Sequence, residues 1–480
     1  ILSRPSNLRQ RPTARDFFSP LVSDTNKNTI MAIEDSFSAS VSEEITPLTY
    51  GQAMLLKQSK EWSNASEKEI KTLEDNNTWE LVNRPAGRKV IKNKWVYKIK
   101  INPSNNERKY KARLTAKGCS QVPWLDFDPD DISSTVMKHK SLRAILAIAV
   151  NLGYHIISLD AISAFTQASL NEEIYMEQPE GFEKFAELDL VCKLLKSLYG
   201  LKQASENWHK DVVEFLMTLQ FKPTLMDDNV FVKLSKTGMP MYICLYVDDF
   251  TCAFGDNDKE EFHQVKIALM QKFKMNDLGN LTSILGISVS YNKTKGLLLL
   301  SQSQYIISIL SVFNMLSCKP SYFPMQKEID QHGKLSQFHC PSNQQEVDYM
   351  VDKPYRKLIG MLIYLINCTR PDLTFTVSTL ARFTSNPGPM HWKAGMRVLQ
   401  YLKHTVHFSL TYTRTLTSLH SPLILDTYSD ADWGGDVNDR FSVHGFVIRL
   451  QGCPISWTSK KQKFVALSTT ESEYVGLSES

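Results

Sequence analysis

The chain has 480 residues, of which 42% are hydrophobic and 22% are charged, and its formal net charge is +4. This length allows about two to four domains, and the composition is that of a globular protein rather than a disordered or fibrous one. Because the net charge is small, any surface that binds nucleic acid must come from local clustering of cations. The sequence contains neither an apolar run of membrane-spanning length nor a signal-peptide core, so it predicts an intracellular protein without a membrane segment.

The eight cysteines are scattered and form no Cys-x-x-Cys pair, which argues against a zinc knuckle and a dithiol redox site. Cys192, Cys244 and Cys252 lie inside apolar runs, as is typical of reduced, buried thiols in an intracellular protein. The chain begins with Ile1, so we interpret it as a piece of a longer reading frame.

Residues 1–45 are rich in Ser, Thr, Asn and Arg without sustained periodicity, which predicts a flexible leader or linker. Helical periodicity follows from Tyr50 to Leu73, where Ser66 and Glu69 have the spacing of a capping box. Residues 88–118 then contain eleven Lys or Arg and a single acid, Glu107.

Cations alternate with apolar residues in two parts of this basic segment, KWVYKIK from Lys94 and KYKARLTAK from Lys109, and turn residues separate them. This alternation predicts a β-hairpin with one apolar and one cationic face. The cationic face includes Lys111, Arg113 and Lys117. We expect it to bind phosphate, because so many uncompensated charges repel one another unless a polyanion neutralises them. The alternative is a solvated basic surface.

An amphipathic helix is predicted next, capped by Ser141 and ended by Gly153. The apolar strand that follows ends at Asp160. An acid in this position either caps the next turn or binds a metal ion, and the strand alone leaves both possibilities open.

Two apolar runs between Met241 and Gly255 flank Asp248 and Asp249, which predicts a hairpin with two carboxylates at its tip. Two like charges this close disfavour joint ionisation unless a cation lies beside them. A hard divalent metal ion with oxygen ligands is the simplest such cation. An ordinary Asp-Asp turn is the alternative.

The remaining pattern predicts helices, strands and one long polar connection. Helices are expected at 207–219, 259–273 and 304–315, a strand at 296–300, a polar connection at 317–353, and further helices at 355–368, 373–385 and 391–403. A strand, an acidic turn and a second strand are expected at 423–448, a third strand near Ile455 and a helix at 469–480.

Twelve phrases of the sequence occur in an order that points to one family. They are TWELV at 78, KWVYKIK at 94, YKARLTAKG at 110, EEIYMEQPEGF at 172, KSLYGLKQA at 196, LYVDD at 245, MNDLGNLTSILGISVS at 275, RKLIGMLIYL at 356, TRPDLTF at 369, HWKAGMRVLQYLK at 391, YSDADWGGD at 428 and SWTSKKQKFVALSTTESEY at 456. The chain resembles, over about residues 48–480, the polymerase polyprotein of copia-type long-terminal-repeat retrotransposons.

The resemblance implies an α+β chain with a right-hand polymerase fold of fingers, palm and thumb, then a tether and a truncated ribonuclease H-like α/β domain. The implied boundaries are 46–316 for the reverse transcriptase fingers and palm with the start of the thumb, 317–353 for the polar connection, 354–410 for a helical thumb or connection segment and 411–480 for the ribonuclease H-like domain. No protease or integrase signature is present, so we expect those upstream parts of the polyprotein to lie outside this chain.

The implied activity is RNA-directed and DNA-directed DNA synthesis, in which a nucleotide passes from a dNTP to a primer 3′ hydroxyl on an RNA or DNA template. Asp160, Asp248 and Asp249 resemble the palm carboxylates that hold two Mg²⁺ ions, which Mn²⁺ can replace. Phe165 resembles the aromatic gate that excludes a 2′-hydroxyl. Gln203 resembles the glutamine that lines the site of the incoming nucleotide.

Further roles are implied for residues on either side of these. Lys111, Arg113 and Lys117 resemble the fingers residues that clamp the triphosphate. The sequence Leu285-Gly286-Ile287 resembles the primer-grip turn, where glycine permits close backbone approach.

Asp430 and Glu471 match the first two carboxylates of ribonuclease H, another two-metal nuclease. The family site uses further acids downstream, and the sequence ends before they appear. The resemblance therefore predicts a nuclease domain without activity.

The chain departs from the family pattern at residues 132–137, 165–170 and 202–208, although the proposed metal ligands are retained. These departures fit a drifting genomic copy and leave two alternatives. The first is a catalytically inactive remnant that binds nucleic acid without turnover. The second is a different two-metal palm polymerase that uses DNA templates only.

Overall fold

The computed structural model describes residues 18–20, 46–101, 107–184, 189–325, 334–415 and 422–479. Most of the expected leader and the predicted turn at 102–106 lie outside the described residues. Within the described ranges, no helix is both long enough and apolar enough to cross a membrane.

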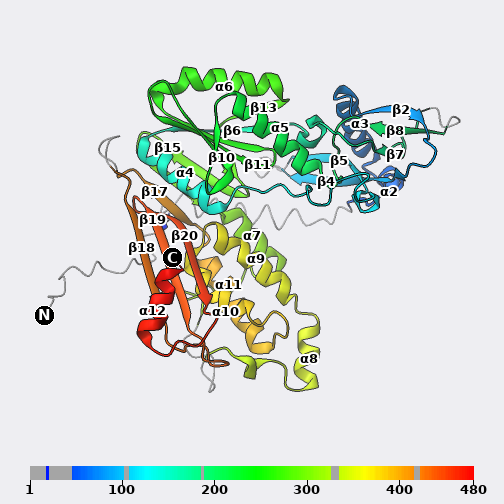
Figure 1. Cartoon of the computed structure of the whole chain (residues 1–480). Helices are drawn as coiled ribbons and strands as arrows, with labels where there is room; N and C mark the ends of the chain where they lie inside the picture. The colour runs from blue at the N-terminus through cyan, green and yellow to red at the C-terminus, as the bar shows by residue number, and fades with distance from the viewer. Residues whose placement is uncertain are drawn as a thin grey trace.

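A six-stranded antiparallel sheet forms the centre of the molecule, in the order β13-β6-β12-β11-β10-β9. Its strands are β6 (His155–Ala161), β9 (Lys222–Thr224), β10 (Asp227–Leu234), β11 (Pro240–Tyr246), β12 (Asp249–Phe254) and β13 (Met275–Asn280). The helices α5 (Ala204–Thr218) and α6 (Lys259–Lys272) cover one face, and α4 (His139–Leu152) covers the other (Figure 1). We call this layered unit the palm.

Both faces of the palm sheet bury apolar side chains. Phe231 and Phe250 pack with Trp208 of α5 and Phe262 of α6 in one cluster. On the other face, Leu146 of α4 packs in a second cluster with Cys244 and Ala253. The sheet is therefore covered on both sides, which fixes which residues of each strand face which layer.

The basic hairpin that the sequence predicts belongs to a second unit, which we call the fingers and which comprises the described residues of 50–116 and 175–194. Its strands β4 (Asn93–Ile101) and β5 (Arg108–Ala116) pair antiparallel, and Trp95, Tyr97 and Leu114 are buried. Tyr97 meets Trp62 of α3 (Ser59–Asp75) with ring centroids 5.1 Å apart. Alternate residues of the hairpin therefore pack against α3, and the cations lie on the opposite, solvent-facing side.

The rest of the fingers consists of the short helix α2 (Tyr50–Leu55) and a four-stranded sheet. That sheet has the order β2-β8-β7-β3, with β2 (Trp79–Asn83), β3 (Val90–Ile91), β7 (Tyr175–Met176) and β8 (Leu190–Leu194). Figure 1 shows these elements together at one end of the molecule, beyond the palm.

Two predicted helix starts are wrong. Helix α3 begins at Ser59, and the hydroxyl of Ser66 donates to the Trp62 carbonyl inside the helix instead of capping it. Helix α4 begins at His139, two residues before Ser141. The predicted end of α4 is confirmed, because Gly153 has φ +67° and its N–H bonds to carbonyls of the last turn.

A second antiparallel sheet joins residues that lie far apart in the chain. Its order is β1-β17-β16-β15-β14, with β1 (Phe18–Pro20), β14 (Ser283–Ile284), β15 (Ile287–Asn292), β16 (Leu297–Ser301) and β17 (Phe408–Thr413). The expected boundary between residues 410 and 411 falls inside β17, which pairs with β16. The start of the predicted C-terminal domain is thus part of a sheet whose strands β14, β15 and β16 come from residues 283–301.

A helical unit follows β16. Its helices are α7 (Ser303–Val312), α8 (Gln344–Val351), α9 (Tyr355–Cys368), α10 (Thr374–Ala381) and α11 (Pro389–His404). Apolar residues of α7, α9, α10 and α11 share one core. Helix α9 has the bounds that periodicity predicts.

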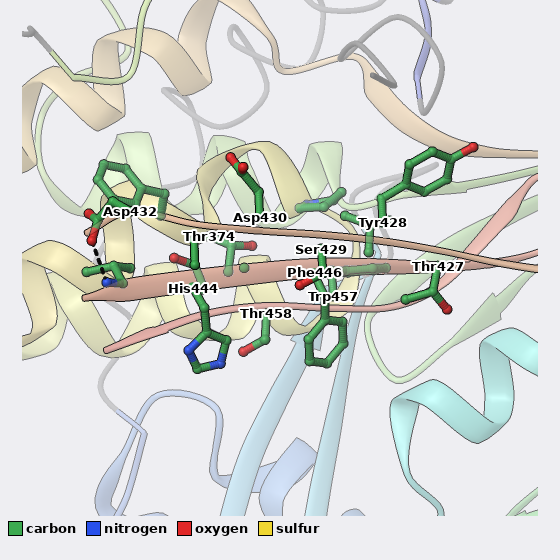
Figure 2. A pocket seen from close by; sticks show the side chains of 17 residues that line it. Thr374, Thr427, Tyr428, Ser429, Asp430, Asp432, His444, Phe446, Trp457 and Thr458 are labelled. Carbon is green, nitrogen blue, oxygen red and sulfur yellow. Dashed lines mark hydrogen bonds between the residues drawn. The ribbon is translucent and has the colours of Figure 1, made fainter. Parts of the chain in front are cut away.

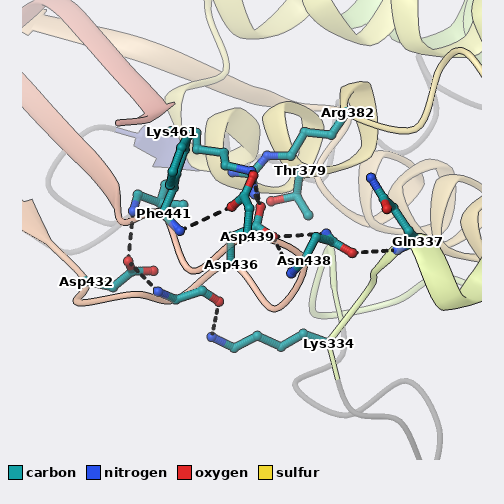
Figure 3. Close-up of polar contacts among 12 residues, drawn as sticks. Lys334, Gln337, Thr379, Arg382, Asp432, Asp436, Asn438, Asp439, Phe441 and Lys461 are labelled. Carbon is teal, nitrogen blue, oxygen red and sulfur yellow. Dashed lines mark hydrogen bonds and ion pairs between the residues drawn. The ribbon is translucent and has the colours of Figure 1, made fainter. Parts of the chain in front are cut away.

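The last described unit is a three-stranded antiparallel sheet with the order β18-β19-β20, packed against α12 (Thr469–Ser478). Its strands are β18 (Leu425–Ala431), β19 (Val443–Leu450) and β20 (Cys453–Lys461). We call this unit the C-terminal sheet. An ion pair joins the loop between β18 and β19 to the helical unit (Figure 3). The Asp436 carboxylate lies 2.8 Å from the guanidinium of Arg382, directly after α10, and 2.9 Å from the ammonium of Lys461 at the end of β20.

A strained residue lies in the loop between the fingers hairpin and α4. Trp124 has φ +64°, its N–H donates to the Phe127 carbonyl at 2.8 Å, and its side chain is 71% exposed. A bulky residue in the left-handed region costs about 1–2 kcal/mol, and little buried contact offsets this cost here.

Trp124→Gly is therefore expected to raise the free energy of unfolding by about 0.5–1 kcal/mol, because relief of strain exceeds the added entropy of glycine in the unfolded chain. Urea unfolding measures the change. Trp124→Ala is the matched control, since alanine keeps the Cβ and should gain little. An equal gain in both variants would assign the effect to the indole ring and contradict the prediction.

Candidate active site

The pairing of β6 with β12 brings two distant carboxylates together. Asp160 on β6 lies directly opposite Asp249 on β12. Cβ atoms of directly opposed residues are typically about 4.5–5.5 Å apart. Asp248 precedes Asp249 in the turn, and its carbonyl accepts from the Ala161 N–H at 2.9 Å. All three predicted carboxylates therefore lie at one end of the palm sheet.

The turn that carries Asp248 is held in a strained conformation. Tyr246 pairs with Asp249, so Val247 and Asp248 form a two-residue turn, and Val247 has φ +56°. Positive φ at the first central residue alone is the pattern of a type II′ turn, which ordinarily takes glycine. The indole N–H of Trp208 in α5 donates to the Val247 carbonyl at 2.6 Å and anchors this turn.

The charged groups around the turn have opposite effects on the pKa of Asp248. Burial raises the pKa of the Asp248 carboxyl, and the Asp160 carboxylate raises it further, whereas Arg113 and Lys111 of the fingers lower it. The amide of Asn276 on β13 donates to Asp160 at 3.4 Å. The palm carboxylates and the cations of the hairpin are therefore close enough to influence each other.

The donor chemistry of the three carboxylates fits a hard divalent cation, which binds oxygen ligands and would relieve the repulsion between Asp160 and Asp248. In the described part of the chain, however, no group of three or more His, Cys, Asp or Glu side chains is already arranged to hold a metal ion. The carboxylates share one end of the sheet without forming a closed set of ligands.

The cationic face of the hairpin lies on the fingers side of this site. Lys111 and Arg113 alternate with buried residues along β5, and Lys98 of β4 lies directly opposite Lys111. Directly opposed like charges destabilise a sheet, so an anion between them would be favourable. Lys117 follows β5, and its backbone N–H bonds to the Lys92 carbonyl.

Tyr199 connects this face to the palm. The Arg113 guanidinium lies 4.6 Å from the centre of the Tyr199 ring. The Phe165 ring meets the same tyrosine edge-on, with centroids 5.1 Å apart. Phe165 is half-buried in the short helix Ala164–Gln167 directly after β6, and it packs against both palm and fingers. The role of Phe165 as a sugar gate stays a prediction.

Gln203, which the resemblance predicts to line the site of the incoming nucleotide, is buried between two loops. Its side chain is 1% exposed, its carbonyl accepts from the Gln121 amide at 3.0 Å, and its amide donates to the Asp126 carbonyl at 2.8 Å. Both ends of the side chain therefore hold the loop before α4 against the start of α5. A nucleotide contact of Gln203 stays a prediction.

The predicted primer-grip residues form a tight turn. Leu285 and Gly286 join β14 to β15 and have φ +50° and +69°, and Ile287 begins β15. Two central residues with positive φ are the pattern of a type I′ hairpin turn. The Tyr364 hydroxyl of α9 donates to the Leu285 carbonyl.

The two predicted nuclease carboxylates lie in the C-terminal sheet and its helix. Asp430 lines a cavity of about 650 Å³ beside Thr374 and Phe375 of α10. Figure 2 shows Asp430 and Tyr428 on one side of the strands and His444 on the other. Helix α12 packs on the His444 side, where Gly476 lies beside it.

Glu471 lies in the first turn of α12, where its carboxylate accepts from the Leu467 N–H at 2.6 Å. It therefore serves as a cap for the helix start. Since Asp430 and α12 belong to opposite faces of the sheet, a shared site of the two carboxylates stays a prediction.

The family model described as reverse transcriptase (RNA-dependent DNA polymerase) matches residues 76–327, a segment that includes all three palm carboxylates. The chain belongs to this reverse transcriptase family.

Its relatives are transposon proteins. It is 38% identical over 439 residues to the retrovirus-related Pol polyprotein from transposon TNT 1-94 of Nicotiana tabacum, and 37% identical over 440 residues to that from transposon RE1 of Arabidopsis thaliana. Each alignment covers 92% of this chain, but only 32% and 28% of the respective relative. The copia-type resemblance is confirmed, and the chain spans about a third of the length of these relatives.

A shorter relative and one solved structure extend the comparison. The putative transposon Ty5-1 protein YCL074W of Saccharomyces cerevisiae is 30% identical, and the alignment covers 67% of this chain and 98% of that protein. The foamy viral protease-reverse transcriptase in complex with double-stranded DNA is 13% identical with a TM-score of 0.46, covering 96% of this chain and 69% of that one. The second similarity is too weak to support an argument.

Two residues that contact this candidate site are not among those predicted from the sequence. Tyr199 lies in the phrase YGLKQA, and Trp208 lies in ASENWHK directly after it. Their position beside a motif that resembles the family was the feature of the sequence that could have indicated them. Glu69 of α3 is a third. Its carboxylate accepts from the Leu114 N–H at 3.4 Å beneath the hairpin, and burial raises its pKa to about 7 while Arg113 and Lys111 act against the rise.

Glu69 should make stability depend on pH. Its carboxyl binds a proton more tightly in the folded chain (pKa about 7) than at its ordinary value of 4.5. Its contribution to stability is thus largest below pH 4.5 and is lost as the pH rises through 7, by about 1.4 kcal/mol for each unit of pKa shift.

Glu69→Gln keeps the acceptor and removes the titration, so its free energy of unfolding should fall less between pH 5 and pH 8 than that of the wild type. Urea unfolding across this range measures the difference. The exposed neighbour Glu67→Gln is the control and should behave like the wild type. Parallel profiles for Glu69→Gln and wild type would disprove the assignment.

Proposed function

We propose that this chain is an RNA-directed and DNA-directed DNA polymerase of a copia-type retrotransposon. It transfers a nucleotide from a dNTP to the 3′ hydroxyl of a primer on an RNA or DNA template. The observation that carries the proposal is the register of β6 and β12, which sets Asp160 opposite Asp249 and beside Asp248 in a chain of the reverse transcriptase family.

Asp160, Asp248 and Asp249 would hold Mg²⁺, or Mn²⁺ in its place, through their carboxylate oxygens. When bound, a pair of such ions lowers the pKa of an attacking hydroxyl and neutralises charge on the transferred phosphate. Trp208 keeps the turn of Asp248 in place through its bond to the Val247 carbonyl.

The fingers supply the positive charge that a triphosphate requires. Arg113 and Lys111 lower the pKa of the Asp248 carboxyl through their charge, and the Arg113 guanidinium lies over the Tyr199 ring. Arginine and lysine in such positions bind phosphate oxygens and stabilise developing charge without a proton transfer. Lys117, which directly follows β5, would add a further cation for the triphosphate.

Phe165 would discriminate between sugars. Its ring is half-buried and held edge-on by Tyr199, so it cannot swing away without losing that contact. A fixed ring next to the sugar rejects a 2′-hydroxyl by steric overlap.

A second activity, cleavage of an RNA strand by Asp430 and Glu471, is less favoured. Asp430 lines a cavity on the α10 side of the C-terminal sheet, and the helix of Glu471 packs on the other side. We propose that residues 425–478 are a ribonuclease H-like segment whose role is structural.

Asp160→Asn or Asp248→Asn should lower primer extension by about a hundredfold or more, since loss of a ligand must exceed the 10–100-fold effect of losing a residue that only supports a ligand. Template-primer affinity should change little, because cations of the hairpin hold the phosphates. Extension on RNA and DNA templates with Mg²⁺, and its loss with a chelator, measure the effect. Asp228→Asn, exposed on β10 of the same sheet, is the control.

The same assay separates the alternatives. Normal extension by either ligand variant would refute the palm assignment. A wild type that binds template-primer without extending it is an inactive remnant, and one that extends on DNA templates only is a DNA-dependent polymerase.

Phe165→Val removes most of the ring and should raise ribonucleotide incorporation relative to deoxynucleotide incorporation by about tenfold, the equivalent of a clash relieved by about 1.4 kcal/mol. Single-nucleotide incorporation with each substrate measures the ratio. Phe215→Val, in α5 against Phe273, controls for the loss of a ring from the palm. Thermal melting accompanies both, because the new cavity costs about 1–3 kcal/mol. An active variant with unchanged sugar selectivity would make Phe165 a core residue only.

A further inference from the structure

The last two turns of α9 touch the predicted primer-grip turn. The hydroxyl of Tyr364 donates to the carbonyl of Leu285. A Cβ placed on Gly286 would lie only 2.9 Å from the same hydroxyl oxygen, so the turn and the phenol are in direct contact. Tyr305 of α7 holds the Tyr364 ring from the side, with centroids 4.9 Å apart and planes at 86°.

Tyr364 also lies close to the hairpin that carries the palm carboxylates. Tyr246, the residue before the Val247-Asp248 turn, packs with Tyr364 and Leu285 against one apolar cluster. Burial raises the pKa of Tyr364 to about 12, and Cys368, Tyr305 and Tyr246 add to the rise. The phenol is therefore protonated near neutral pH and remains a hydrogen-bond donor to the grip turn.

The end of α9 is fixed by two other units of the molecule. The indole N–H of Trp457, on β20 of the C-terminal sheet, donates to the Ile366 carbonyl at 2.6 Å. The guanidinium of Arg143, in α4 of the palm, donates to the Asn367 and Cys368 carbonyls at 2.6 and 3.1 Å. The last carbonyls of a helix have no partner within the helix, so these donors complete it.

Arg143 and Trp457 act together at this helix end. The guanidinium lies 4.0 Å from the Trp457 ring centre, and its Nε donates to the Ile455 carbonyl at 2.8 Å. Arg143 is only 7% exposed. Tyr364 thus projects from a helix whose end is held between the palm and the C-terminal sheet.

We propose that Tyr364 is a positioning residue for the primer 3′ end, and that Trp457 of the C-terminal sheet steadies the helix that carries it. The inference rests on the proposed polymerase function and on the role of residues 285–287 as the primer grip. The bond to the Leu285 carbonyl sets the orientation of the Leu285–Gly286 peptide, the backbone that faces the primer. A misplaced 3′ hydroxyl costs reaction rate more than binding, because reaction requires close alignment of the reacting atoms.

Tyr364→Phe removes only the hydroxyl and leaves the ring against Tyr305. The rate constant for adding one nucleotide should fall about two- to tenfold, the effect of one hydrogen bond. The KM for dNTP and the Kd for template-primer should stay within about twofold, since the phosphate contacts are untouched. Trp457→Phe keeps an aromatic ring for Arg143 and loses the N–H, so it should lower the same rate constant by a smaller factor.

Tyr474→Phe is the matched control, because Tyr474 is 72% exposed on α12 and far in sequence from α9. A 2-aminopurine base at the primer 3′ end adds a readout that does not depend on turnover. Its fluorescence in the complex should differ between wild type and Tyr364→Phe and should be the same in wild type and Tyr474→Phe.

The outcomes are separable. A slower rate constant at full active-site burst amplitude, with changed 2-aminopurine fluorescence, supports the positioning role. A lower burst amplitude with an unchanged rate constant would mean that Tyr364 only stabilises the fold, and it would overturn the proposal. If the wild type does not extend primers, the proposed function fails, and the 2-aminopurine signal alone decides whether Tyr364 acts on the primer end.

Discussion

The antiparallel register of β6 and β12 is the constraint on which the site depends. This register places Asp160 opposite Asp249. The packing of apolar side chains, rather than any interaction of the carboxylates, determines the register. Phe250 of β12 is buried towards α5 and α6, whereas Ala253 is buried towards α4. Because a shift of one residue would exchange the two faces of the strand, burial on both faces strongly opposes such a slip. The core therefore forces together carboxylates that repel each other.

That repulsion is balanced from the fingers. Arg113 and Lys111 lower the pKa of Asp248 against burial and Asp160, and Tyr199 holds the Arg113 guanidinium at the junction of fingers and palm. Phe165 touches the same tyrosine, so the cation of the hairpin and the predicted sugar gate share one support. A charge distribution with cations on one side and carboxylates on the other suits a ligand that carries phosphate and binds metal ions.

Local sequence patterns predicted local structure well. The bounds of α9, the Gly153 end of α4 and the two-faced hairpin follow from periodicity and from glycine at a left-handed position. The predicted helix starts at Ser66 and Ser141 were wrong. Several residues in each segment could cap a helix, and tertiary packing decides which turn is the first. Resemblance named the palm carboxylates, but only strand pairing could place them side by side. The contacts of Gln203 and Tyr199 join segments that lie far apart in the chain, so the spacing of residues in the sequence does not predict them.

The C-terminal sheet was expected to follow a tether, yet the structure joins it to the palm. Among the described residues, the buried Arg143 cation is hydrogen-bonded to carbonyls of α9 and β20 and lies over the Trp457 ring. Leaving such a cation buried and unsatisfied would cost several kcal/mol, so these partners cannot separate independently. Strand β17 adds a second link, since it pairs with β16 directly before the C-terminal sheet begins. The palm, helix α9 behind the Leu285–Gly286 turn and the C-terminal sheet are thus joined by direct contacts. Under the proposed function, a change in the C-terminal sheet would reach the polymerase site through α9.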